Sequence, residues 1–396
     1  MLPLSGSTKK RQASQHFYVY LITFLPRIFL TLSFFGAAFL AGRASRSPNN
    51  LTTLGLQVAT AVSDICSWPP EFRPLPLQEF LDVETLPFSH PLLPADSSTL
   101  VYKTKRPGAS YGPHREFWET VANGEWEPTT FRVILSALKA GASEGRGTHF
   151  DIGGWVGPTS LFAAHFAKRV VTLEPDPRAF NELHANARLN PSLLPRLALH
   201  RHCLSNINGP VTMTGPSPMG SSMSRVNGAS RIPLSVESEA NWGIKMVTWP
   251  AICSTPSSFA ERIGLTFDEI ALVKIDVEGA EAVILPALVA WLTRSAKLLG
   301  RERKPPLFVE LHVEYWPETS SAETVATALS SYAFAFASHA ERPGHTAKDN
   351  VLQRFYPQKL LKDSGHMCPD KQPFCMVLLV DKLDVWVEEL LDPTTT

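Results

Sequence analysis

The stretch that decides the fold is Thr148 to Pro158, which reads THFDIGGWVGP. Its first five residues form a short strand candidate ending at Ile152, and Ser160 to Ala167 has a helical pattern. The glycines between these segments let the backbone turn tightly and approach a ligand closely, and Pro158 suits the first turn of a helix. Strand, glycine turn and helix in this order predict the first unit of a nucleotide-binding α/β sheet.

A second strand candidate, Arg169 to Leu173, ends directly before Glu174. Glu174 follows Asp151 by 23 residues. An acidic residue about 20 residues further on, at the carboxyl end of a strand, is placed to accept hydrogen bonds from ribose hydroxyls. Pro177 to Asn190 then has the pattern of a helix. The combination predicts a site for the adenosine part of a ligand.

The glycine pattern and the charge of the chain exclude other ligands. The sequence has no Gly-Lys-Ser/Thr element of a P-loop, and the glycines at 153, 154 and 157 do not form a G-x-G-x-x-G frame. A pyrophosphate cradle is therefore disfavoured. Lys+Arg and Asp+Glu are both 37, so no net field favours a nucleic-acid partner.

Further motifs occur on both sides of this stretch. In chain order they are Gly124-Glu125-Trp126-Glu127-Pro128, Asp151-Ile152-Gly153, Gly157-Pro158, Glu174-Pro175-Asp176-Pro177, Leu183, Asn186, Leu189-Asn190, Leu204-Ser205, Gly209, Gly220-Ser221-Ser222, Val273 to Glu281 (VKIDVEGAE) and Leu307 to His312 (LFVELH). Because these motifs occur in the same order as in the FkbM-type S-adenosylmethionine-dependent methyltransferases, the stretch from about Phe117 to His312 resembles that family. It departs from the family at Gly154-Trp155, in the inserted stretch Arg225 to Trp249, and in Lys245 to Ser254, which lacks the usual Thr-Leu-Asp.

The resemblance implies a Rossmann-like class I methyltransferase sandwich with a mostly parallel sheet. We expect Phe374 to Val380 to form a late strand, the antiparallel edge of that sheet. The implied cofactor is S-adenosylmethionine, and the implied acceptor is a hydroxyl of a sugar or glycan. The residues implied to bind the cofactor are Asp151, Gly153, Gly154, Gly157, Glu174, Asp176 and Ser205.

Catalytic candidates follow two later strands. Asp276 comes after the apolar run Ala271 to Ile275, and Glu310 and His312 come at the end of the next strand candidate. Parallel strands deliver ligand-facing groups at their carboxyl ends, so we expect these side chains to be neighbours. His312 is the candidate general base, with Asp276 as its partner or as a carboxylate that orients the acceptor.

Other readings of this region remain open. Asp276 is a cap if a helix begins near Gly279, and, independently, His312 is a packed loop residue without a catalytic role. A divalent ion held by Asp276, Glu310 and His312 would activate the acceptor hydroxyl, although no metal site is assigned. Glu278 and Glu281 are three residues apart, a spacing typical of a solvated or paired helix face.

The N-terminal region predicts a membrane anchor. Residues 17–41 are 25 residues with one charge, and a helix of this length extends about 37 Å, enough to cross a bilayer. Arg27 interrupts it at a cost of about 2.5–3.5 kcal/mol. A cleaved signal peptide and an organelle transit peptide therefore remain alternatives. Basic residues before the segment favour a cytoplasmic tail at 1–16 and a catalytic domain in the Golgi or ER lumen.

The remaining chain divides at about residue 112. Residues 42–112 are rich in proline, which predicts a stem, and 113–396 are expected to form the methyltransferase domain. None of the five cysteines forms a CxxC pair, so a structural zinc site is disfavoured. Cys368 and Cys375 either close a small disulfide loop in an oxidising lumen or remain thiols.

Two rival functions fit parts of the pattern. A nicotinamide-dependent oxidoreductase uses a similar first motif, but the glycine frame and the second signature at Ile275 to Glu281 disfavour it. A non-catalytic binding module displayed on a membrane is the other rival, and the intact acidic motif residues argue against it.

Overall fold

The computed structural model describes residues 84–88, 90–93, 100–104, 115–216, 224–226, 246–316, 321–339, 352–364, 368 and 374–391. All of them belong to one compact unit, Pro74–Thr396. The predicted tail at 1–16, the anchor at 17–41 and its signal-peptide and transit-peptide alternatives lie outside the described residues. Within the described ranges, no helix has the length and apolar character needed to cross a membrane.

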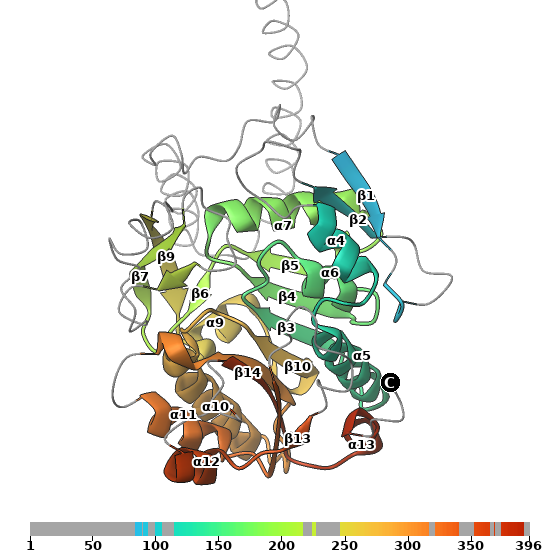
Figure 1. Cartoon of the computed structure of the whole chain (residues 1–396). Coiled ribbons are helices and arrows are strands. Elements are labelled where there is room, and N and C mark those ends of the chain that lie inside the picture. The colour runs from blue at the N-terminus through green and yellow to red at the C-terminus, as the bar shows by residue number, and fades with distance from the viewer. Residues whose placement is uncertain are drawn as a thin grey trace, which may run out of the picture. The chain divides into compact units, whose positions relative to one another are not determined.

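A central eight-stranded sheet has the order β13-β12-β14-β11-β10-β3-β4-β5 (Figure 1). Its strands are β3 (Thr148–Ile152), β4 (Arg169–Leu173), β5 (Leu197–His200), β10 (Ile270–Ile275), β11 (Leu307–His312), β12 (Phe334–His339), β13 (Gln353–Arg354) and β14 (Phe374–Val380). The strands β5, β4, β3, β10 and β11 are parallel. The chain moves outward from β3 through β4 to β5 and then returns to β10 on the other side of β3, which confirms a Rossmann-like sheet with a switch point between β3 and β10.

The predicted place of Phe374–Val380 is wrong, although the strand and its direction are confirmed. β14 is antiparallel to β11 and to β12 and lies between them, whereas the sheet ends at the two-residue strand β13. Every residue of β14 after Phe374 is buried. A strand that is apolar on both faces needs cover on both faces and a neighbour on each side, which an edge position does not supply.

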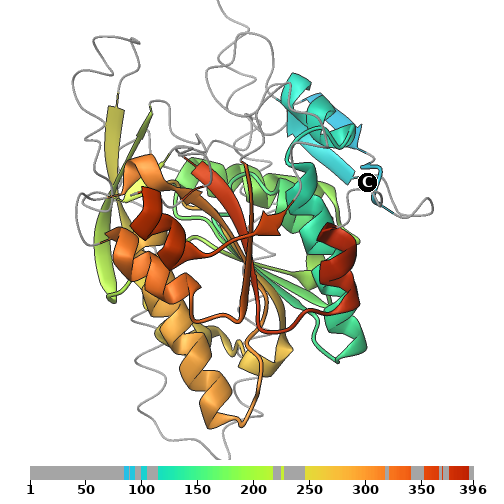
Figure 2. The ribbon, with the colours of Figure 1, turned by 60° about the horizontal axis from the view of Figure 1, so that its bottom comes forward.

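Helices cover both faces of the sheet, so it has two hydrophobic cores. Side chains of successive strand residues point to opposite faces. Leu272 and Phe308 accordingly belong to one core, whereas Val273 and Val309 belong to the other. Residues of α4 (Arg115–Ala122), α5 (Pro128–Ser143), α6 (Pro158–Ala163), α7 (Pro177–Leu189) and α13 (Val385–Leu391) contribute to the first core. Residues of α9 (Pro256–Ile263), α10 (Glu281–Leu298), α11 (Ser321–Leu329) and α12 (Pro357–Ser364) contribute to the second (Figure 2).

A second, four-stranded sheet has the order β6-β9-β7-β8. Its strands are β6 (Cys203–Leu204), β7 (Gly209–Pro216), β8 (Arg225–Val226) and β9 (Met246–Ser254). The described residues also include three short 3-10 helices, η2 (Leu194–Arg196), η3 (Phe267–Glu269) and η4 (Val313–Tyr315). The predicted insertion Arg225 to Trp249 therefore has its two ends in this sheet, and residues 227–245 lie outside the described part.

The expected stem contains a strand pair. β1 (Glu84–Phe88) and β2 (Leu100–Thr104) are antiparallel. The backbone N–H of Val101 donates to Asn190 Oδ1 at 2.9 Å, and Asn190 Nδ2 donates to the carbonyl oxygen of Val101 at 2.8 Å. Because Asn190 directly follows α7, these bonds hold β2 beside the end of α7. The folded unit thus extends upstream of the boundary predicted at residue 113.

Two disulfides lie in the described ranges. Cys203–Cys253 joins β6 to β9, and Cys368–Cys375 joins the segment before β14 to its second residue. The sequence indicated the second as one of two alternatives and gave no sign of the first. Cys375 lies opposite Leu311 in the sheet, so this bridge lies beside the end of β11.

Candidate active site

A cavity of about 370 Å³ opens at the carboxyl ends of β3, β4, β10 and β11. Its wall includes the glycine turn after β3, Glu174 after β4, and the segment after β10. It also includes the last residues of β11 and of β6. The cavity therefore lies at the switch in strand order, where open α/β sheets bind their ligands.

The glycine turn is shaped by close backbone approach. Gly153 has a φ of 89°, and a Cβ there would overlap the carbonyl oxygen of Asp276. A Cβ on Gly154 would overlap Cγ2 of Thr172. The N–H groups of both glycines donate to the carbonyl oxygen of Leu173, at 2.9 and 3.0 Å. Both glycines line the cavity, and neither tolerates a side chain.

Asp151 supports the turn from behind. Its Oδ2 accepts hydrogen bonds from Thr159 Oγ1 at 2.9 Å and Ser160 Oγ at 2.6 Å, which holds the start of α6. Lys274 Nζ lies 3.7 Å from Oδ1. Asp151 is fully buried and is not among the residues that line the cavity, and the same holds for Gly157, which precedes α6. The geometry gives both a supporting role.

Glu174 lines the cavity with its carboxyl group held by the backbone. The N–H of Trp155 donates to Oε2 at 2.9 Å, and the N–H of Asp176 donates to Oε1 at 2.8 Å. Burial first, and then the nearby carboxylate of Asp176, raise the pKa of Glu174 to about 8. The group is thus fixed in place and close to its point of ionisation at neutral pH.

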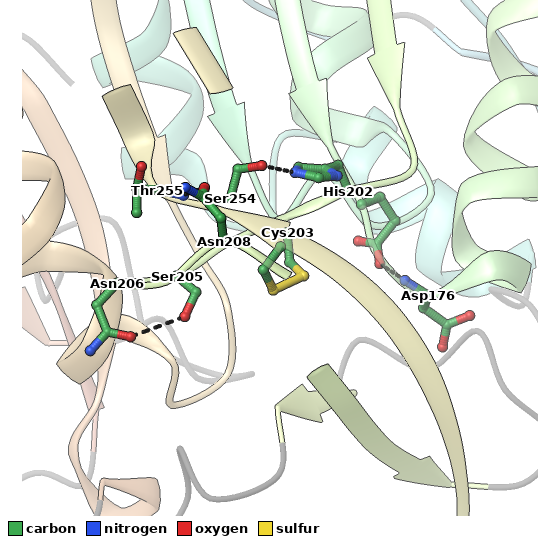
Figure 3. The surroundings of a disulfide bond; sticks show 10 residues. Asp176, His202, Cys203, Ser205, Asn206, Asn208, Ser254 and Thr255 are labelled. Atoms are coloured by element: carbon green, nitrogen blue, oxygen red, sulfur yellow. Dashed lines mark hydrogen bonds between the residues drawn. A yellow bond between two sulfur atoms is a disulfide. The ribbon is translucent and has the colours of Figure 1, made fainter. Parts of the chain in front are cut away.

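Asp176 and Ser205 do not line the cavity. Figure 3 shows both residues in the surroundings of the Cys203–Cys253 bridge. Asp176 caps α7 by accepting the N–H groups of Arg178 and Ala179, at 2.8 and 3.2 Å. The N–H of Ser205 donates to the carbonyl oxygen of Ser254 at 3.0 Å, beside the Cys203–Cys253 bridge. Neither Asp176 nor Ser205 lines the cavity, so their predicted contact with the cofactor has no support from this geometry.

Asp276, Glu310 and His312 come together as expected. Each offers a ligand atom, and these atoms all lie within 4.8 Å of one another. The pairing of β10 with β11 places the three side chains at one end of the cavity. The capping alternative for Asp276 is wrong, because α10 begins at Glu281 and the preceding Ala280 gives no side-chain cap.

His312 is surrounded by carboxylates. Its Nδ1 lies 3.2 Å from Glu281 Oε1, and its Nε2 lies 3.6 Å from Glu278 Oε2 and 3.7 Å from Glu310 Oε1. Burial alone would lower the pKa of the ring, but the hydrogen bond and the negative charges raise this pKa well above its usual 6.5. In this arrangement the ring is a proton donor, whereas the predicted role as base needs it neutral.

Glu278 and Lys274 also line this part of the cavity. Burial is the main cause that raises the pKa of Glu278 to about 8 and the pKa of Glu310 to about 7. Lys274 lies 3.3 Å from Asp276 and lines the cavity. Burial would lower the pKa of Lys274, but the carboxylates of Asp276 and Asp151 outweigh it, so the pKa is raised.

Backbone strain is concentrated at the cavity. In the described part, three residues other than glycine have positive φ: Glu127 (43°), Trp155 (45°) and Glu278 (52°). All three line the cavity. Such conformations cost about 1–3 kcal/mol each and cluster at functional sites, where the surrounding structure holds them.

The likenesses of this chain to known proteins are weak. No family model matches the chain, and no curated protein matches it significantly. Among solved structures, it is similar to methyltransferase FkbM from Methylobacillus flagellatus KT, with 13% identity and a TM-score of 0.29 over 59% of this chain and 43% of that chain. The O-methyltransferase from Bacillus cereus in complex with SAH has 12% identity and a TM-score of 0.31 over 66% and 85%. Cofactor-bound Rv0187 from MTB has 11% identity and a TM-score of 0.31 over 69% and 100%.

This chain thus spans less than half the length of the FkbM structure. Likenesses at these identities and TM-scores carry no argument about activity. The Rossmann-like fold rests on the strand order and on the place of the cavity.

Sequence reasoning missed Lys274, Glu278 and Glu281 as site residues. Glu281 is fully buried, and its carboxylate accepts from the N–H of Gly279 at 3.0 Å and from Trp316 Nε1 at 3.0 Å. Of the two readings given for Glu278 and Glu281, the solvated face is therefore wrong, whereas pairing is found, because both carboxyl groups lie within 4 Å of a ring nitrogen of His312. Lys274 had a detectable signal, because it is the one charged residue in the apolar run Ile270 to Ile275.

Proposed function

We propose that this chain is an S-adenosylmethionine-dependent methyltransferase that acts on a hydroxyl group. One observation carries the proposal: a single cavity is lined both by the glycine turn with Glu174 and by Asp276, Glu310 and His312. The first group has the features that bind adenosine, and the second group can bind and orient a polar acceptor beside it.

The residues present fit the cofactor. Gly153 and Gly154 bring backbone to the cavity surface, and the Glu174 carboxylate, once ionised, has lone pairs left for the ribose hydroxyls. Phe117, Trp126 and Trp155 add aromatic surface to the same cavity. When bound, S-adenosylmethionine supplies a methyl group carried on a positively charged sulfur.

The group of Asp276, Glu310 and His312 would hold the acceptor. The side chain of Asp276 is 24% exposed, so its carboxylate is open to a ligand in the cavity. Lys274 fixes this carboxylate through the contact at 3.3 Å, and the protonated ring of His312 can donate to an acceptor oxygen. Such fixed groups place the acceptor oxygen for an in-line transfer, which is the main contribution that binding makes to this kind of reaction. The methyl group passes from the sulfur to the acceptor oxygen, and the carboxylate of Asp276 accepts the proton that the hydroxyl loses.

The acceptor class and the location belong to the same proposal. A sugar or glycan hydroxyl and a Golgi or ER lumen rest on the family resemblance and on the predicted anchor at 17–41. The disulfides Cys203–Cys253 and Cys368–Cys375 support the location, because such bonds persist in oxidising compartments.

The proposal is tested by titrating the full-length protein with S-adenosylmethionine and with its demethylated product by calorimetry. Glu174→Ala should weaken binding by about 1.5–3 kcal/mol, because it removes a charged acceptor. Unchanged affinity in this variant contradicts the assigned cofactor site. Transfer of a labelled methyl group to members of a glycan panel then identifies the acceptor, and the absence of any methylated glycan removes the glycan proposal.

A further inference from the structure

The end of the cavity formed by β10 and β11 has the donor atoms of a cation site. Asp276 and Glu310 offer carboxylate oxygens and His312 offers a ring nitrogen, all within 4.8 Å of one another. Oxygen and imidazole ligands bind divalent ions at about 2.0–2.2 Å, so atoms at this mutual separation can share one ion with small side-chain movements. The three residues come from two neighbouring strand ends, which holds their Cα positions.

The orientation of His312 is the second observation that points to a ligand. Its Nδ1 lies 3.2 Å from Glu281 Oε1, so the opposite nitrogen, Nε2, faces Glu310 and Glu278 at the cavity wall. A histidine that binds a metal usually donates its other ring N–H to a carboxylate, which fixes the tautomer and the ring plane. The His312–Glu281 pair has this arrangement.

Glu281 is itself held too firmly to be a ligand. It is fully buried, and it accepts from two backbone N–H groups, of Val277 and Gly279, and from Trp316 Nε1. Its carboxylate is therefore committed to protein donors and to His312. This role is supporting, and Glu281 does not line the cavity, whereas Asp276, Glu278, Glu310 and His312 do.

The carboxyl groups around His312 favour the binding of a cation beside this ring. Asp276, Glu278, Glu281 and Glu310 are four carboxyl groups around one imidazole, and Lys274 is the neighbouring cation that contacts the cluster. Lys274 engages Oδ2 of Asp276, which leaves the other oxygen of that carboxylate for a second positive partner. Carboxyl groups gathered in a poorly solvated cavity are costly unless a positive charge compensates them.

We propose that Asp276, Glu310 and His312 form a binding site for one divalent cation, which takes the place of the proton on Nε2 of His312 and releases that proton to solvent. Two carboxylates and one imidazole suit an ion of intermediate softness such as Mn²⁺, whereas Mg²⁺ prefers oxygen ligands alone. Three protein ligands leave further coordination positions open toward the cavity. The role of the ion rests on the proposed function: an acceptor hydroxyl bound at an open position becomes a stronger acid and is held near the cofactor.

Direct binding of Mn²⁺ to the full-length protein tests the site without any turnover. We expect electron paramagnetic resonance of free Mn²⁺ and calorimetry to show one tightly bound ion per chain. Glu310→Gln and Asp276→Asn should each weaken binding at least about 10-fold, because each removes a charged ligand while keeping its volume. Glu281→Gln should weaken binding about 10- to 100-fold by releasing the ring of His312.

A matched control uses an acidic residue of the same unit away from the cavity. Asp268 is exposed and pairs with Arg301 at 2.8 Å, so Asp268→Asn removes a carboxylate without touching the cluster. It should bind Mn²⁺ as the parent does. Far-ultraviolet circular dichroism and thermal melting exclude misfolding in each variant. If Glu281→Gln does not fold, Trp316→Phe removes one hydrogen bond to the same carboxylate and should give a smaller loss of affinity.

Two results would overturn the site: no saturable binding of Mn²⁺ below millimolar concentration, or equal binding in the parent, Glu310→Gln and Asp276→Asn proteins. The experiment also separates this inference from the proposed function. Binding of S-adenosylmethionine without Mn²⁺ binding would contradict the ion site alone. Mn²⁺ binding without S-adenosylmethionine binding would contradict the methyltransferase proposal alone.

Discussion

The backbone N–H of Trp155 donates to Glu174 Oε2 at 2.9 Å and so joins the glycine turn after β3 to the end of β4. Trp155 has a positive φ of 45°, which is unusual for a bulky residue. The contact places a carboxyl group, a strained backbone and an aromatic ring at one end of the cavity. The ionisation of Glu174 therefore bears on the proposed binding of the cofactor as well as on stability.

The first prediction concerns protons released when the cofactor binds. The pKa of Glu174, raised to about 8 mainly by burial, leaves this carboxyl protonated at pH 7 in the free protein. Ribose hydroxyls favour the ionised form, so binding at pH 7 should release a proton, and affinity should rise from about pH 6 to pH 8. Calorimetry in buffers of different ionisation enthalpy measures the proton directly. Equal release in Glu174→Gln and in the parent contradicts the assignment.

The raised pKa of Glu174 also predicts how the free energy of unfolding changes with pH. Because its folded-state pKa lies above the ordinary 4.5, the folded chain binds more protons than the unfolded chain between these two values. The contribution of Glu174 to the free energy of unfolding thus decreases as pH rises from about 4.5 to about 8. Glu174→Gln should flatten the pH dependence of stability in this window, as followed by denaturant titration.

The second prediction concerns His149 in the core. It is fully buried, and neither ring nitrogen has a hydrogen-bond partner among the described residues. Burial lowers the pKa of His149 to about 4, so stability should fall as pH drops from about 6.5 to about 4, by about 3 kcal/mol in total. His149→Leu should remove this loss in an acid-unfolding titration. His184→Gln, at an exposed position, is the control and should change it little.

The third prediction separates catalysis from cofactor capture. Asp276→Asn keeps the size of the side chain but removes the charge that orients the acceptor or binds an ion. We expect methyl transfer to slow by about 10²-fold or more with nearly unchanged affinity for the methyl donor. Single-turnover kinetics and calorimetry measure the two quantities separately. Full turnover in the variant would show that the charge of Asp276 is not needed.

The fourth prediction concerns the membrane anchor proposed for residues 17–41. An uncleaved anchor should leave the protein in the membrane pellet after extraction with alkaline carbonate. With a luminal catalytic domain, protease added to sealed vesicles should spare the unit Pro74–Thr396. Release by carbonate would favour the signal-peptide or transit-peptide alternative, and digestion of the unit in sealed vesicles would reverse the proposed orientation.

The parts of the fold that the sequence predicted are those with local signals. β3 and β4 have the predicted bounds, because each apolar run ends at a glycine turn or an acidic residue that stops it. The second sheet was not predicted, since β6 has two residues and its partner β9 lies 50 residues away in the chain. Pairing over such a distance has no local pattern.

Part of the site was predicted because local sequence patterns mark the ends of the strands. Strand ends give the positions of Glu174, Asp276 and Glu310, and the structure brings the last two together. The sequence does not show which charged side chains are buried. Glu281 is among the least exposed residues, although acidic residues are mostly exposed, and its part in the site was therefore not predicted. The alternation of apolar residues also does not distinguish an edge strand from an inner one, which is why β14 was misplaced.

The bridge between Cys368 and Cys375 ends opposite Leu311, the residue between Glu310 and His312. Thiol chemistry at the start of β14 is therefore next to the strand end that presents two of the candidate ligands. Protein produced in a reducing cytosol would have these two cysteines as thiols, whereas protein produced through a secretory route would have the disulfide. The intact mass of each preparation should therefore be measured before the absence of activity or binding is counted as a negative result.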